Sequence, residues 1–280
     1  MVELKYVKKR KRKKLAAIIS ALATLGISVF VIVAFLGRFV GTFTVALDTG
    51  SVKLSLAEKH SFEDSTSYIK FDSLPPFDLT TFVNLPAASV LDNEETPYLA
   101  GSKTDSNNHE VLKFFKTTFF VRNSGDATAS YELKVNITKD DPGIVKIDGY
   151  FREVRLSSIL RVMVYENDND DNHNYTVYAQ KRTLTDYPTV GEDDNVELRE
   201  YTSFDKEETL RRYGNDLPYY AEMFESDYCI ATRPVANFVP GDVKRYTIVV
   251  WLEGEDHDAS GTPPTGGNLK LGVTINAYEN

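Results

Sequence analysis

Residues Thr117–Thr138 read TTFFVRNSGDATASYELKVNIT, and this stretch indicates the fold class of the chain. Its second half alternates apolar and polar residues, with the apolar positions Tyr131, Leu133, Val135 and Ile137. Strict alternation is typical of a β-strand that has one buried face and one wet face. A turn-forming run, Asn123–Asp126, separates this strand from an apolar strand around Phe114–Arg122. The pattern therefore predicts a β-hairpin.

The same alternation recurs toward the C-terminus. It is found at Tyr246, Ile248, Val250 and Leu252, and again at Leu269, Leu271, Val273, Ile275 and Ala277. The turn sequence Pro240-Gly241-Asp242 precedes the first of these strands. The Pro/Gly-rich loop Gly261–Gly267 joins the two strands, which predicts a second, terminal hairpin.

Several short strands with turn signals, and no alternation of strands with helices, predict an all-β fold. We expect a β-sandwich or jelly-roll-like domain. One short helical insertion is predicted at residues 206–213, because Asp205–Glu208 resembles a capping box and Gly214 fits the C-terminal cap. Residues 57–110 contain four prolines and no clear period, so this segment is expected to be rich in loops.

The N-terminus differs sharply in charge from the rest of the chain, which has a net charge of −9 over 280 residues. Residues 1–14 carry a charge of +7, from Glu3 and eight basic residues that include Lys8, Lys9, Arg10, Lys11, Arg12, Lys13 and Lys14. The remaining residues carry −16. A basic run of this kind suits either nucleic acid or the anionic surface of a membrane.

The next segment, Leu15–Leu36, favours a membrane over nucleic acid as the partner of the basic run. It has 22 residues and no charge, and as a helix it would be roughly 33 Å long, enough to cross a bilayer. Basic flanks stay in the cytoplasm. We therefore expect residues 1–14 inside the cell, residues 15–36 as an uncleaved transmembrane signal anchor, and residues 37–280 outside. A cleaved signal peptide is the alternative, although its apolar part is usually shorter.

Three stretches together resemble the TasA/camelysin type of bacterial surface and biofilm-matrix proteins, in particular their membrane-anchored, uncharacterised relatives. They are GTFTVALDTGSVKLSLAE directly after the apolar segment, TTFFVRNSGDATASYELKV, and FVPGDVKRYTIVVWLEGEDHD followed by GGNLKLGVTINA. The resemblance implies a jelly-roll-like domain outside the cell and a fibre subunit that donates an N-terminal strand to its neighbour. The middle of the chain is not covered by it.

Two acidic stretches are candidates for calcium, which prefers six to eight oxygen ligands. One follows the strand that ends near Leu252 and contains Glu253, Glu255, Asp256 and Asp258. The other has Asp168, Asp170 and Asn172 at alternate positions, as at the start of a calcium loop. Neither has the full spacing of a known calcium motif. Charged turns that keep strand ends soluble are the favoured interpretation.

An enzyme is the weakest hypothesis. A transpeptidase of the sortase type would use Cys229, the only cysteine, with His173 and Arg233. The residues before Cys229 do not match the sortase strand, and His173 lies in a polar run typical of a loop. No other catalytic pattern stands out, so the sequence predicts a protein that is not an enzyme.

Val249 and Trp251 lie on the second face of the strand that carries Tyr246 and Ile248, so both of its faces are apolar. Either another layer of the chain covers that second face, or the two side chains contact another subunit. We expect a single-pass protein of the cell surface with a structural or interaction role. Its expected partners are the lipid bilayer and other surface proteins or further copies of itself, with no nucleic acid and no cofactor apart from the alternative of Ca²⁺.

Overall fold

The computed structural model describes residues 41–48, 52–74, 77–104, 110–147, 149–167, 175–180, 221–254, 256 and 263–279. The basic segment 1–14, the predicted membrane segment 15–36 and the predicted helix 206–213 lie outside the described residues. These three expectations therefore stay predictions.

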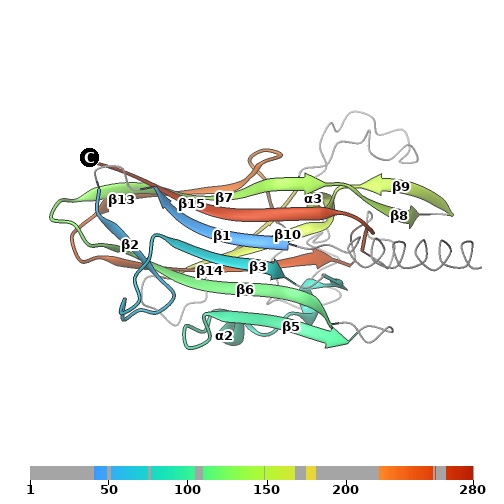
Figure 1. Ribbon diagram of the computed structural model, residues 1–280, viewed down its shortest axis with the longest axis horizontal. Helices are drawn as coiled ribbons and strands as arrows, with labels where there is room; N and C mark the ends of the chain where they lie inside the picture. The colour runs from blue at the N-terminus through green and yellow to red at the C-terminus, as the bar shows by residue number, and fades with distance from the viewer. Residues whose placement is uncertain are drawn as a thin grey trace, which may run out of the picture.

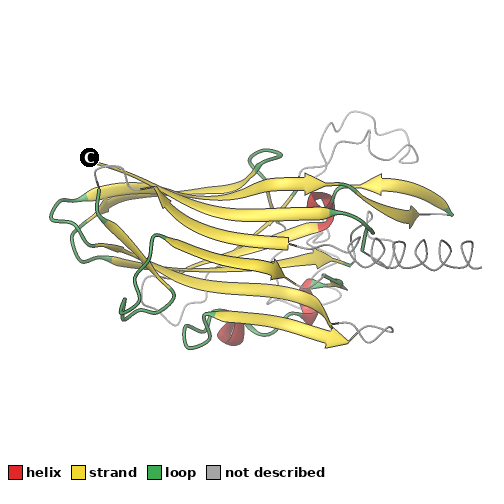
Figure 2. Cartoon of the chain, in the orientation of Figure 1, coloured by secondary structure: helices red, strands yellow, loops and turns green. Residues whose placement is uncertain are grey.

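The described chain consists mainly of β-strands in two large sheets that face each other (Figure 1, Figure 2). The five-stranded sheet has the order β13 (Cys229–Phe238), β7 (Ala129–Asp141), β15 (Asn268–Glu279), β1 (Gly41–Asp48) and β3 (Tyr68–Leu74). The eight-stranded sheet has the order β12 (Glu222–Met223), β11 (Tyr175–Ala179), β10 (Leu160–Asn167), β14 (Val243–Glu253), β6 (Glu110–Asn123) and β2 (Leu54–Ala57), with β4 (Leu79–Thr80) beside β14 and β5 (Tyr98–Thr104) beside β6. This arrangement confirms the predicted all-β class.

Smaller elements complete the described residues. A separate hairpin consists of β8 (Gly143–Ile147) and β9 (Tyr150–Val154). The helical elements are single turns: η1 (Phe82–Asn84), α2 (Ala88–Leu91) and α3 (Leu156–Ile159).

The main hydrophobic core lies between the two large sheets. The predicted inward faces are confirmed, because the alternating apolar residues of β7, β14 and β15 belong to one buried cluster. Only Ala277, at the end of β15, is partly exposed. A hydrogen bond of 2.8 Å between the hydroxyl groups of Tyr131 and Tyr246 joins the two sheets across this core. It gives both buried hydroxyls a partner.

The outer faces of the two sheets differ. On β7 and β15, residues such as Lys134 and Thr274 face outward and remain partly exposed. On β10 and β14 most of the outward side chains are buried, because residues 82–96, with η1 and α2, cover them. Figure 1 shows α2 on the far side of β6 from β7 and β15. A second hydrophobic cluster forms there, around Met163, Val249 and Trp251. The molecule thus has a third layer over one face of the sandwich.

Both predicted hairpins are wrong in their pairing. β6 lies in the eight-stranded sheet and β7 in the five-stranded sheet, and β14 and β15 are divided in the same way. The physical reason lies in the second face of each strand. β6 and β14 are largely buried on both faces and need cover on both sides, whereas β7 and β15 have a polar face that suits solvent.

The connections between the sheets meet at one end of the molecule, around the buried side chain of Asn123. Its amide donates to the carbonyl oxygens of Ala127 at 2.9 Å and Phe238 at 2.7 Å, and its side-chain oxygen accepts from the backbone N–H of Gly125 at 3.0 Å. This one residue therefore holds together the β6–β7 and β13–β14 crossings. Gly241, with a φ of 89°, provides the positive φ that the second crossing requires.

β1 lies inside its sheet although it is the first described strand. It pairs in parallel with β15 on one side and antiparallel with β3 on the other. Phe43 and Val45 point into the main core, with exposed fractions of 1% and 0%. The first described strand therefore lies between two other strands of the sheet.

Candidate functional site

The acidic end of β14 is the first site that the sequence singled out. Glu253 is buried, with 1% of its surface exposed, and its carboxylate accepts a hydrogen bond of 3.0 Å from the indole N–H of Trp251. The next backbone N–H, that of Gly254, donates to Thr80 in β4 at 2.7 Å. The end of β14 is thus fixed against β4 and does not form an open loop.

Asp256 is engaged in the same way. One carboxylate oxygen lies 2.8 Å from the guanidinium of Arg161 in β10, and neither side chain has any exposed surface. Arg161 also donates to the carbonyl oxygen of Leu160 at 3.0 Å. A carboxylate that neutralises a buried guanidinium is committed to that role, because separating the two would leave a charge in the interior.

These contacts assign a structural role to Glu253 and Asp256. Among the described residues, no group of three or more His, Cys, Asp or Glu is placed to hold a metal ion. The other predicted calcium ligands, Glu255, Asp258, Asp168, Asp170 and Asn172, lie outside the described residues, as does His257.

Val249 and Trp251 are completely buried by the chain itself. The ring of Phe82, from η1, lies 6.1 Å from that of Trp251, and Leu91 of α2 belongs to the same cluster. The second face of β14 was expected either to be covered by another layer of the chain or to contact another subunit. The burial of Val249 and Trp251 beneath η1 and α2 shows that another layer of the chain covers it. The two side chains do not form a patch on the surface of a single chain.

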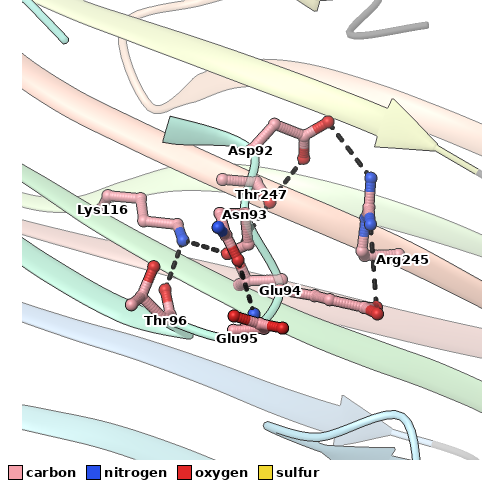
Figure 3. A network of polar contacts seen from close by, with 9 residues as sticks. Asp92, Asn93, Glu94, Glu95, Thr96, Lys116, Arg245 and Thr247 are labelled. Carbon is pink, nitrogen blue, oxygen red and sulfur yellow. Dashed lines mark hydrogen bonds and ion pairs between the residues drawn. The ribbon is translucent and has the colours of Figure 1, made fainter. Parts of the chain in front are cut away.

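Sequence reasoning missed a polar network beneath residues 92–96, drawn in Figure 3. Asp92, of which 3% is exposed, accepts a hydrogen bond of 3.1 Å from the hydroxyl of Thr247 and forms an ion pair of 3.2 Å with Arg245. The hydroxyl of Thr247 also lies 2.8 Å from that of Thr118. β6 and β14 provide the threonines and Arg245, while the loop after α2 provides Asp92.

Lys116 of β6 is the other buried charge of this network. Its ammonium donates to the carbonyl oxygen of Asn93 at 2.6 Å and to that of Thr96 (Figure 3). Burial lowers the pKa of Lys116 to about 8; Asp92 opposes this shift and Arg245 adds to it. The network fastens the covering layer to the sheet. A lysine among phenylalanine and threonine residues, Lys116 in the stretch KFFKTTFF, is the sequence signal from which the network could have been found.

The pKa of Lys116 predicts a rise in stability at alkaline pH. Its value of about 8 in the folded chain lies below the ordinary lysine value of roughly 10.4. Between these values the unfolded chain binds more protons than the folded chain, so the free energy of unfolding increases with pH. We expect the wild type to gain stability relative to Lys116→Met from pH 8 to pH 10, and no such trend below pH 7. Urea unfolding of both proteins checks this, and parallel pH profiles would contradict it.

The surroundings of Cys229 do not favour a nucleophile. Its thiol donates to the carboxylate of Glu225 at 3.3 Å. Burial raises the pKa of the Cys229 thiol and the neighbouring Glu225 adds to the shift, although the hydroxyl of Thr232 opposes it. Arg233 forms an ion pair of 2.7 Å with Glu166. His173 lies outside the described residues, so the set of Cys229, His173 and Arg233 is not tested as a whole.

No protein-family model matches this chain, and no curated protein is similar enough to indicate a relationship. In the part of the chain that the structure describes, no helix is both long and apolar enough to cross a bilayer. The predicted span 15–36 is outside that part.

Proposed function

We propose that the chain is a membrane-anchored protein of the cell surface. Its domain acts by contact with other proteins, as a structural component of the envelope or extracellular matrix. The observation that carries the proposal is the position of β1. Gly41 follows the end of the predicted membrane segment, Leu36, by five residues, and β1 is hydrogen-bonded on both sides. A force applied through the anchor would act parallel to β1, so the hydrogen bonds of β1 to β15 and β3 would resist it together.

We treat the domain as jelly-roll-like because consecutive strands cross between its sheets at β6–β7 and β13–β14, as they do in Greek-key sandwiches. The resemblance to TasA/camelysin-type proteins stays a prediction. A fibre of the kind that the resemblance implies would require β1 to leave its own sheet and enter that of a neighbour.

The edges of the five-stranded sheet, β13 and β3, are the places where another strand could add. β13 is the poorer template, because it contains Pro234 and two shifts of register. We therefore propose β3 as the edge for contact with other surface proteins or further copies of the chain. Within the part of the chain that the structure describes, nothing favours the alternative of a calcium-ordered binding module, since Glu253 and Asp256 are already engaged inside the domain.

The test uses the full chain produced in a bacterial host. The chain should remain in the membrane fraction after carbonate extraction. Its measured mass should be that of a chain that still begins at the initiating residue. Protease added outside the cell should degrade the domain. Leu25→Arg/Val29→Arg should abolish retention, because each arginine in the middle of the segment costs about 2.5–3.5 kcal/mol on insertion scales. A mature protein that begins near Phe35 or Leu47 would contradict the anchor and indicate release.

The same membranes allow a test of the contacts. Treatment with a lysine-reactive cross-linker should give species larger than one chain. If only the monomer is found at every expression level, the interaction role is wrong, even where the anchor is correct.

A further inference from the structure

The β8–β9 hairpin projects from the end of the domain at which β1 begins. Figure 1 shows it beyond the ends of β7 and β15, on the opposite side of the molecule from the C-terminus. The strands pair antiparallel, from Gly143 opposite Val154 to Ile147 opposite Tyr150. Between the last pair the chain has Asp-Gly, a preferred sequence for a two-residue loop, and Gly149 has a φ of 87°.

The tip of this hairpin is apolar and exposed. Tyr150 has an exposed fraction of 72% and Phe151 of 77%, the largest values among the large hydrophobic side chains of the described residues. Ile144, at 52%, lies on the same face of the hairpin as Phe151. Lys146 lies opposite Phe151 in the register and Arg152 follows Phe151, while the acidic Glu153 lies opposite Ile144. Aromatic and basic residues in this combination are typical of the interface between a membrane and water.

The base of the hairpin is held firmly to the sandwich. Ile144 and Thr265 exchange two backbone hydrogen bonds, of 2.7 and 2.8 Å. Gly143 packs so closely against Pro264 that a Cβ atom at this position would lie 2.7 Å from the proline ring. Thr265 lies in the loop before β15, three positions ahead of Asn268, and Lys270 of β15 lies opposite Thr42 of β1. The hairpin is therefore tied to the same end of the domain as the start of β1.

The linker between the predicted membrane segment and β1 is about as long as the β8–β9 hairpin. Five Cα–Cα steps separate Leu36 from Gly41, which limits the gap between the predicted membrane segment and the domain to roughly 17 Å. The four steps from Gly143 to Ile147 extend the hairpin by roughly 13 Å. A domain tethered this closely, with a projection of nearly the same length on the tethered end, can rest its tip on the bilayer.

We propose that the tip of the β8–β9 hairpin, with Tyr150 and Phe151, inserts into the interface of the bilayer that holds residues 15–36. The inference rests on the proposed membrane anchor and adds the orientation of the domain. The tether and the hairpin form two points of contact with the same leaflet. The long axis of the sandwich then points away from the membrane, with the connections around Asn123 at the far end.

The test is the quenching of an introduced tryptophan in the full chain, reconstituted into vesicles of phosphatidylcholine and phosphatidylglycerol. Phe151→Trp places the probe at the tip, and Val239→Trp places a matched probe at an exposed position, 45% accessible, at the far end. The buried Trp251 of the wild type supplies the baseline. Lipids brominated on the acyl chain should quench the tip probe several-fold more than the far probe, and its emission should shift to the blue.

Flotation of the same vesicles separates the two proposals. If the wild type floats and the tip probe is quenched no more than the far probe, the hairpin inference is wrong while the anchor remains; the tip then faces water or a protein. If the wild type does not float with the vesicles, both proposals are wrong. A chain with Tyr150→Ser/Phe151→Ser should float as the wild type does, because residues 15–36 alone provide the anchor.

Discussion

Replacing Asp256 with alanine should lower the free energy of unfolding by about 3–5 kcal/mol, the usual cost of leaving one member of a buried ion pair without its counter-charge. Asp256 and Arg161 have no exposed side-chain surface, and their charged atoms lie 2.8 Å apart. The variant would keep the guanidinium in the interior without this carboxylate. Urea unfolding of the purified protein in mild detergent measures the loss.

A double variant provides the matched control. Arg161→Met/Asp256→Leu removes both charges and keeps apolar volume, and replacements of this kind are often neutral or stabilising. It should therefore be much more stable than Asp256→Ala. If the double variant is destabilised as much as the single one, volume and packing explain the loss, and the electrostatic account of the pair is wrong. If Asp256→Ala loses less than 1 kcal/mol, the pair is not buried as described.

Replacing Trp251 with alanine should cost a similar amount, about 3–5 kcal/mol, because it removes a large buried side chain and leaves a cavity. The loss would fall on the layer outside the eight-stranded sheet, where Trp251 packs with Phe82 and Leu91. It would also take the indole donor from the buried carboxylate of Glu253. We therefore expect residues 79–91 to exchange their amide hydrogens faster, while the core between the two sheets keeps its protection.

Hydrogen exchange followed by mass spectrometry checks this pattern, with Trp251→Phe as the control. Phenylalanine keeps most of the apolar volume and mainly removes the N–H group that donates to Glu253. The free energy of unfolding should therefore fall by less, about 1–3 kcal/mol, the usual cost of leaving a buried acceptor without its donor. Uniform loss of protection over all strands of Trp251→Ala would contradict a separate covering layer.

The acidic end of β14 shows how far sequence reasoning extends to a site. The residues were identified because acids are crowded there, but their roles depend on partners that the local sequence does not contain. Arg161 is separated from Asp256 by 95 positions in the chain. An arginine inside the apolar strand LRVMVY was itself a signal that a buried carboxylate lies opposite it, because a charge is rarely buried alone.

For β7, β14 and β15, the sequence by itself determined that the residues form strands and which face of each packs into the main core. That information is local, because successive side chains alternate across a strand. Only the tertiary structure decided which strands pair, that β6 and β7 lie in different sheets, and that residues 82–96 cover the second face of β14. Pairing depends on contacts between distant residues and on the need of each apolar face for cover, and neither is contained in the period of a single strand.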